Sequence, residues 1–240
     1  MVKTYFFSYG DNKFTKSKER ILKEANESNF FDYCSVYGPK NIEEEFKIKF
    51  GDILKQRRGG GYWIWKFYFI NKYLQEINEG DYLIYCDTGC TINKDGINRF
   101  NEYKDLLKKS DYGIISFEMK YKEYKYTIKE LYNYLNLDIN NFELNNSQYA
   151  ATVLILKKCS HSLLLIDECL KLLNFDKKLI TDYYNKYQGE YFIDNRHDQS
   201  ILSLLRKKYG SIILNDETYT KINKDTFDPR FPFWATRIRI

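Results

Sequence analysis

Short apolar runs alternate with longer amphipathic stretches along most of this 240-residue chain. The runs "KTYFFS" (3–8), "FDYCSVY" (31–37) and "DYLIYCD" (81–87) are rich in aromatic and branched residues, as strands are. The stretch after the glycines at 59–61 instead repeats apolar residues at steps of four and three: Trp63, Phe67, Ile70, Leu74 and Ile77. That spacing predicts an amphipathic helix that begins just beyond Gly61.

The same patterns continue to the end of the chain and predict one alternating α/β fold. Strands are predicted over 3–8, 31–37, 81–87, 112–118, 149–156 and 211–214, and further helices over 14–28, 41–49, 96–109, 127–136, 160–173 and 197–209. The run 81–87 is apolar almost throughout, which is typical of a central strand buried on both faces. We therefore expect a mixed, mostly parallel central sheet flanked by helices.

Composition and length favour a single domain. No linker rich in Pro, Gly or Ser divides the chain, and 43% hydrophobic residues beside 30% charged ones are typical of a globular protein. We expect one domain over 1–240, with a C-terminal tail over 215–240 that wraps the core. Two prolines within 227–240 favour an extended path for that tail.

No segment predicts export or insertion into a membrane. The longest apolar runs, such as 151–156, are far shorter than the roughly 20 residues of a membrane helix. The opening "MVKTYFFSYGDN" resembles a strand and a turn rather than a signal peptide. Five scattered cysteines suit reduced thiols. These features predict an intracellular, cytoplasmic protein.

The charge of +5 comes from interspersed lysines rather than from a basic block. It fits a chain that handles phosphorylated ligands or lies peripherally on an anionic membrane, and equally a soluble protein with no such partner. The Tyr- and Lys-rich stretch 119–134 could stack on sugars or single-stranded nucleic acid, but an exposed helix or loop explains it as well. We expect no nucleic-acid partner.

One candidate site residue is Asp87, the acid that ends the apolar run 81–87. Ligands of open α/β sheets bind outside the carboxyl ends of the strands, so an acid there could hold a metal ion or a substrate hydroxyl. An Asp that starts an ordinary tight turn is the alternative.

A second candidate is the glycine run in "RRGGGYWIWK" (57–66). Three glycines before a helix leave backbone N–H groups free for an anion, and Arg57, Arg58 and Lys66 add charge for a diphosphate. Alternatively, the glycines only let the chain pass close under Trp63 and Trp65. The spacing matches neither a dinucleotide fingerprint nor a P-loop.

The third candidate is "DNRHDQS" (194–200), which opens a predicted helix. His197 beside Asp198 offers ligands for a divalent cation in the first helical turn. Alternatively, Asp194 or Asn195 caps the helix and Asp198 favours its positive end.

Several blocks, in their sequences and in their order along the chain, resemble those of a family of small GT-A-type glycosyltransferases. Members of this family are found in bacterial gene clusters for surface polysaccharides and in large DNA viruses. The blocks are "FFSYGDNKF", "GGGYWIWK", "DYLIYCDTGC", "QYAATVLILKK", "NRHDQSILSLL" and "FPFWATRIR", and they extend almost from end to end of the chain. The resemblance implies one GT-A-like (Rossmann-like) domain that transfers a sugar from a nucleotide sugar, with a UDP-sugar favoured, to a glycan or glycoprotein acceptor. For a viral member, the host cytoplasm or the virion would be the location.

The resemblance also implies roles for the candidates. "CDTG" stands at the D-x-D position, so Asp87, with Thr88 and Gly89, would meet the donor and a Mn²⁺ or Mg²⁺ ion; Gly89 replaces the second acid, which puts metal binding in doubt. His197 would add to the metal or the phosphate, and Asp198 would face the acceptor hydroxyl, as a base or an orienting group.

The remaining implied contacts are with the donor. Tyr9 and Asp11 would meet the nucleotide, and Arg57, Arg58 or Lys66 its diphosphate, while Trp63 and Trp65 anchor the helix in the core. Two rival functions remain: a non-catalytic module that binds a nucleotide sugar or a carbohydrate, motivated by the missing second acid, and a nucleic-acid-binding protein.

Overall fold

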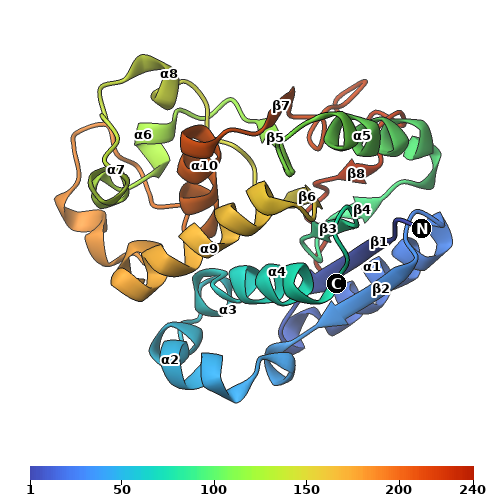
Figure 1. The fold of residues 1–240 in the computed structure, drawn as a ribbon, viewed down its shortest axis with the longest axis horizontal. Coiled ribbons are helices and arrows are strands. Elements are labelled where there is room, and N and C mark those ends of the chain that lie inside the picture. The colour runs from blue at the N-terminus through green and yellow to red at the C-terminus, as the bar shows by residue number, and fades with distance from the viewer.

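The centre of the protein is a six-stranded sheet in the order β2-β1-β3-β6-β5-β7, seen in a computed structural model that describes all residues 1–240 (Figure 1). Its strands are β1 (Thr4–Tyr9), β2 (Tyr33–Tyr37), β3 (Tyr82–Cys86), β5 (Ile114–Glu118), β6 (Val153–Lys157) and β7 (Ile212–Asn215). Only β6 runs antiparallel to its neighbours, β3 and β5. The predicted mixed, mostly parallel sheet is confirmed.

Helices pack on both faces of this sheet. They are α1 (Thr15–Ser28), α2 (Glu44–Leu54), α3 (Gly59–Tyr62), α4 (Trp65–Glu76), α5 (Ile97–Lys109), α6 (Glu123–Tyr126), α7 (Lys129–Leu135), α8 (Phe142–Asn145), α9 (Ser160–Phe175) and α10 (Asp198–Tyr209). Successive strand residues point to opposite faces. Phe7 and Tyr85 therefore join a core with α4, α7, α9 and α10, whereas Phe6 and Ile84 join a second core with α1 and α5. No helix is both long enough and apolar enough to span a membrane.

The predicted strand 149–156 differs from the structure, because β6 begins only at Val153. Side chains satisfy much of the backbone before it. The buried Arg206 donates to the carbonyls of Tyr149 and Ala150, and Lys66 Nζ donates to Ala151 O at 2.9 Å. Residues 149–152 therefore follow an irregular path that ends beside the carboxyl end of β3.

The glycine run forms a left-handed turn, not free amides before a helix. Gly59, Gly60 and Gly61 have φ angles of 58°, 57° and 100°, and Tyr62 and Trp63 follow at 53° and 60°. The N–H groups of Gly60 and Gly61 donate to the carbonyls of Arg57 and Arg58. The prediction of an anion-binding row of N–H groups is therefore not met. Left-handed backbone costs an L-residue about 1–2 kcal/mol, which explains why glycine fills three of the five positions.

The prediction that the helix begins just beyond Gly61 was wrong by one turn. Trp63 has left-handed backbone angles and α4 begins at Trp65, so Trp63 is not part of the helical ridge formed by Phe67, Ile70 and Leu74. Trp65 is buried in the core, while Trp63 is only partly buried. The anchoring predicted for both tryptophans belongs chiefly to Trp65.

We expect Gly61→Ala to destabilise the fold by at least about 2 kcal/mol. A Cβ at Gly61 would lie 2.7 Å from Leu54 Cα, which is backbone, and φ is +100°; strained backbone and overpacking each cost about 1–3 kcal/mol. The matched control is Gly60→Ala, whose Cβ would meet nothing closer than Trp65 Nε1 at 3.8 Å. Urea unfolding of both variants measures the difference, and equal losses would contradict the close approach.

The tail over 215–240 returns across the carboxyl ends of the strands. Its strand β8 (Phe233–Trp234) pairs antiparallel with β4 (Thr91–Ile92), and Phe233 is buried in the core beside α5. Beyond β8, Ile238 N donates to Gly89 O at 2.9 Å. The tail therefore lies directly against the loop that follows β3.

Candidate active site

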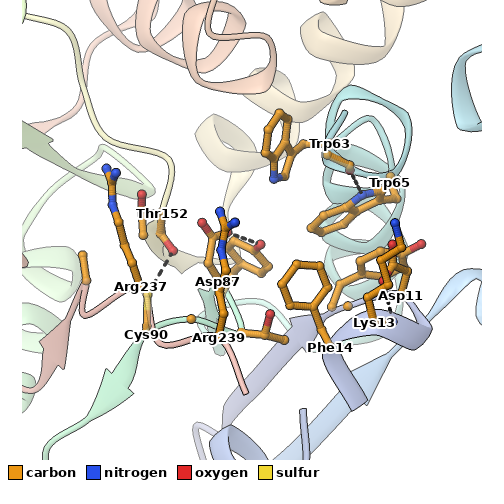
Figure 2. A pocket seen from close by; sticks show the side chains of 18 of the residues that line it. Asp11, Lys13, Phe14, Trp63, Trp65, Asp87, Cys90, Thr152, Arg237 and Arg239 are labelled. Atoms are coloured by element: carbon orange, nitrogen blue, oxygen red, sulfur yellow. Dashed lines mark hydrogen bonds between the residues drawn. The ribbon is translucent and has the colours of Figure 1, made fainter. Parts of the chain in front are cut away.

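A cavity of about 590 Å³ opens where β1 and β3 end (Figure 2). Its lining comes from the loops after both strands, from the glycine turn and from the tail: Tyr9, Gly10, Asp11, Lys13, Phe14, Arg57, Arg58, Gly59, Gly60, Trp63, Trp65, Tyr85, Asp87, Thr88, Gly89, Cys90, Thr152, Tyr219, Ala235, Arg237 and Arg239. All site residues predicted from the N-terminal half of the sequence lie in this lining, except Lys66. The carboxyl ends of parallel strands are the usual place for a ligand in such a sheet.

One wall of the cavity is aromatic. The buried ring of Tyr9 stacks on Trp65 with centroids 3.9 Å apart, and Trp65 Nε1 donates to Gly59 O at 2.9 Å. Burial raises the pKa of the Tyr9 hydroxyl, so this group is un-ionised. Trp63 and Phe14 face the same space (Figure 2). The wall offers flat apolar surfaces for a planar ring.

Asp11 lies at the same side of the cavity and has a local structural role as well. Its Oδ1 accepts from Lys13 N at 2.8 Å and caps the short 3-10 turn Asn12–Phe14. Asp11 therefore has the N-capping role that was considered for Asp194. The second oxygen of Asp11 makes no hydrogen bond within the chain, so it is free to meet a ligand hydroxyl.

Asp87 stands between this cavity and a smaller one of about 290 Å³. Its N–H donates to Thr152 O at 2.9 Å, which fixes the turn after β3. Its Oδ1 accepts from the hydroxyl of the buried Tyr85 at 2.5 Å and lies 3.8 Å from Lys66 Nζ. The Asp87 side chain is 36% exposed, so its other carboxylate oxygen, Oδ2, remains accessible.

Lys66 is buried rather than exposed to the larger cavity. Its side chain is 2% exposed, and Nζ donates to Asp198 Oδ2 at 2.5 Å and to Ala151 O at 2.9 Å. The ammonium also lies 4.7 Å from the centre of the Tyr85 ring. It lines only the smaller cavity, between the two carboxylates. Its predicted contact with a diphosphate stays a prediction, and its observed partners are Asp198 and Asp87.

Asp198 begins α10 and projects its carboxylate into the smaller cavity. Complete burial raises the pKa of this carboxyl to about 6, against the opposite influence of the Lys66 ammonium. At neutral pH the group is therefore mostly ionised, yet it is far more basic than an exposed Asp. A carboxylate of this kind is suited to accept a proton.

His197 is buried and its imidazole is held from one side. Nδ1 donates to Ile180 O at 2.7 Å, so Nε2 carries the lone pair; it has no hydrogen-bond partner and lies 3.5 Å from Asp182 Oδ1. Burial, with the Arg58 charge, lowers the pKa of His197 to about 4. The ring is neutral at pH 7. Its own backbone, at φ 58°, caps α10, so neither Asp194 nor Asn195 is the N-cap.

The two arginines before the glycines differ in their surroundings. Arg57 is exposed at the cavity and makes no ion pair or side-chain hydrogen bond, so its guanidinium is available to a ligand. Arg58 is paired with two carboxylates, those of Asp182 at 3.1 Å and of Asp194. Asp182 Oδ1 also lies 3.5 Å from His197 Nε2, so Arg58 joins the glycine turn to the segment before α10.

The smaller cavity adjoins the larger one and shares six of its lining residues: Arg58, Trp63, Asp87, Thr152, Tyr219 and Arg237. Arg196 and Gln199 line it from the α10 side. The Arg196 guanidinium lies 4.1 Å and 3.9 Å from the ring centres of Tyr121 and Tyr126. Gln199 is held by Gln148 at 2.6 Å and by Ala151 N. Two connected pockets thus meet at Asp87.

Sequence reasoning missed Arg237 and Arg239, which project from the tail toward Asp87 and Thr152 (Figure 2). The only signal in the sequence was the pair of arginines in "TRIRI" (236–240). Their directions could not be predicted from the alternation of an extended segment, because Arg237 has a left-handed backbone at φ 56°.

The residues around Asp87 fit a divalent metal poorly. No group of three His, Cys, Asp or Glu side chains gathers anywhere in the chain, and Gly89 supplies no carboxylate. Asp87 has an ammonium 3.8 Å away, and His197 Nε2 lies beside Asp182, which is already bound by Arg58. A metal ion prefers several oxygen or imidazole ligands without a cation among them.

Comparison with known proteins identifies the fold. No family model and no curated protein matches the chain. Among solved structures, mouse xyloside xylosyltransferase 1 matches with a TM-score of 0.51 at 10% identity over 98% of both chains. An active-site mutant of LgtC matches with a TM-score of 0.50 at 12% identity, over 96% of this chain and 86% of that one.

A further match is the glycosyltransferase GlyE of Streptococcus pneumoniae TIGR4, at 15% identity with a TM-score of 0.45. That match covers 90% of this chain but only 46% of GlyE, so the chain spans about half of that protein's length. At these identities the likeness to the xylosyltransferase and to LgtC establishes the fold: the predicted GT-A-like architecture is confirmed.

Proposed function

We propose that this protein is a glycosyltransferase that moves a sugar from a nucleoside-diphosphate sugar, with a UDP-sugar favoured, to a hydroxyl of a glycan or glycoprotein. The observation that carries the proposal is the pair of connected cavities that meet at Asp87, with the buried Lys66–Asp198 pair next to Asp87 in the smaller cavity. One cavity suits the donor and the other the acceptor, with the reacting atoms between them.

The larger cavity suits the nucleotide part of the donor. Phe14, Trp63 and Trp65 offer apolar faces for the base, and the free oxygen of Asp11 offers an acceptor for a ribose hydroxyl. Thr88 and Gly89 line the floor below Asp87. Cations around the floor neutralise the diphosphate as it leaves, which is the main electrostatic demand of this reaction.

The smaller cavity suits the acceptor. In the transfer, the bond from the anomeric carbon to the diphosphate oxygen breaks and its electron pair leaves with the nucleoside diphosphate. The acceptor oxygen bonds to the same carbon and loses its proton. The ionised Asp198 accepts that proton in an inverting reaction or orients the hydroxyl in a retaining one.

Lys66 and Asp87 act on this centre from the side. Lys66 fixes one oxygen of the Asp198 carboxylate, so we assign it as a positioning residue. Asp87, held by Tyr85, stands where the cavities join and would contact the donor sugar or the leaving group. Mn²⁺ or Mg²⁺ held by Asp87 and His197 is the prediction from the sequence, and no step above depends on it.

A panel of nucleotides and nucleotide sugars tests the proposal. UDP, GDP, CMP, dTDP and their sugars should include one that raises the melting temperature of the wild type, since a ligand of the folded state alone stabilises it. Hydrolysis or transfer of that nucleotide sugar should fall in Asp87→Ala and stay unchanged in the control Asp111→Ala, whose side chain is exposed and unpaired. Binding without turnover under any condition would instead indicate a non-catalytic module.

A further inference from the structure

We propose that Arg237 and Arg239, carried by the tail and docked on Gly89, bind the donor's diphosphate in place of a divalent metal ion. The proposal rests on the proposed function and specifies its donor site. It concerns the position at which the resemblance places the second acid of a metal-binding pair.

The tail occupies the space beside that position. A Cβ on Gly89 would lie 3.3 Å from Arg237 Cα and 3.4 Å from Ile238 O. The Gly89 carbonyl accepts from Ile238 N at 2.9 Å and from Thr236 Oγ1 at 2.8 Å. An acidic side chain at position 89 would crowd the backbone of the tail. Where a metal-binding chain needs a carboxylate, this chain has a glycine against which the tail backbone packs closely.

Several contacts fix the tail at this place. Thr236 Oγ1 lies 3.0 Å from Thr91 Oγ1, and β8 pairs with β4 just before it. Arg237 itself has a φ of 56°, a left-handed conformation that costs an arginine about 1–3 kcal/mol. The surrounding hydrogen bonds maintain this conformation beside Gly89, and both arginines line the cavity.

Most basic side chains of the larger cavity make no ion pair within the protein. Of its five basic residues, only Arg58 makes an ion pair; Lys13, Arg57, Arg237 and Arg239 have none. Arg237 donates only to the Tyr219 hydroxyl, at 2.9 Å and 3.1 Å. Arg230, on the same tail but outside the cavity, is paired with Asp228 at 2.6 Å. Four unpaired basic side chains, Arg237 and Arg239 among them, therefore line the cavity in which the donor would lie.

Guanidinium groups can supply the charge that a metal would supply. A planar guanidinium donates two parallel hydrogen bonds to phosphate oxygens and stays protonated throughout the reaction. The Lys66 ammonium, 3.8 Å from Asp87 Oδ1, already partly neutralises the one carboxylate at this floor. A guanidinium needs no coordinating carboxylate, so the missing second acid does not prevent Arg237 and Arg239 from binding a diphosphate.

The test measures UDP affinity by calorimetry, or that of whichever nucleoside diphosphate the panel selects. The dissociation constant of the wild type should change less than about twofold between EDTA and Mn²⁺. Arg237→Gln and Arg239→Gln should each weaken binding at least about tenfold in both buffers, the size expected for a lost charged hydrogen bond. Arg230→Gln is the matched control and should bind as the wild type does.

Electron paramagnetic resonance of Mn²⁺ gives a second measurement that does not depend on activity. The signal of free Mn²⁺ with protein and UDP should be no weaker than with UDP alone, because the arginines compete with Mn²⁺ for the diphosphate. Binding that needs Mn²⁺, or arginine variants that bind UDP normally, would overturn the inference while leaving a nucleotide-sugar donor in place. Failure of every nucleotide to bind in either buffer would refute the proposed function itself.

Discussion

Asp198→Asn should slow sugar transfer by about a hundred- to ten-thousandfold, the range that a positioned acid or base contributes. Asn has nearly the same shape, so the contact with Lys66 through its amide oxygen can persist, but it accepts no proton at neutral pH. Because Asp198 lines only the smaller cavity, the affinity for the nucleotide should stay within about a factor of two. Steady-state rates and calorimetry on the same preparation measure both effects.

The matched control is Asp194→Asn, the same change four residues earlier. Asp194 binds Arg58 and lies outside both cavities, so we expect a rate loss well below tenfold. If Asp198→Asn transferred sugar within tenfold of the wild type, Asp198 would not be the acid–base or orienting group. If it lost the nucleotide as well, its role would lie in donor binding or in folding.

The central strands could be predicted because their side chains meet apolar layers on both faces. The run 81–87 predicted β3 for this reason. The antiparallel direction of β6 could not be predicted, because direction depends on the path between strands rather than on the residues within one. Trp63 shows the opposite failure: it keeps the helical spacing of 63, 67, 70 and 74, yet the glycines before it turn the backbone left-handed.

The candidate site could be predicted where a residue sits at the end of an element. Asp87 follows a buried strand and Asp198 opens a helix, and such positions face the cleft in this class of fold. Contacts between residues far apart in the sequence could not be predicted. Lys66 and Asp198 are separated by 132 residues, and no local pattern around either residue indicates that they pair. The site roles of Arg237 and Arg239 likewise depend on where the tail docks.

The Lys66–Asp198 pair should be strongly coupled in stability. Lys66→Met removes an ammonium that is 2% exposed and leaves Asp198 buried without its closest counter-charge. Breaking one partner of a buried ion pair costs about 3–5 kcal/mol, whereas replacing both partners is often close to neutral. We therefore expect Lys66→Met to unfold at a much lower urea concentration, and Lys66→Met with Asp198→Asn to recover part of that loss.

The surface variant Lys72→Met is the control, because Lys72 is 38% exposed and its pairs with Glu43 and Glu76 should contribute no more than about 1 kcal/mol. A coupling energy of about 1.5–3 kcal/mol between Lys66 and Asp198 is expected from the four-variant cycle. Purely additive losses would show that the two groups do not stabilise each other. A double variant that regains stability but transfers no sugar would separate the two roles. Lys66 would then offset the free-energy cost of burying the Asp198 carboxylate, and the carboxylate would act in the transfer reaction.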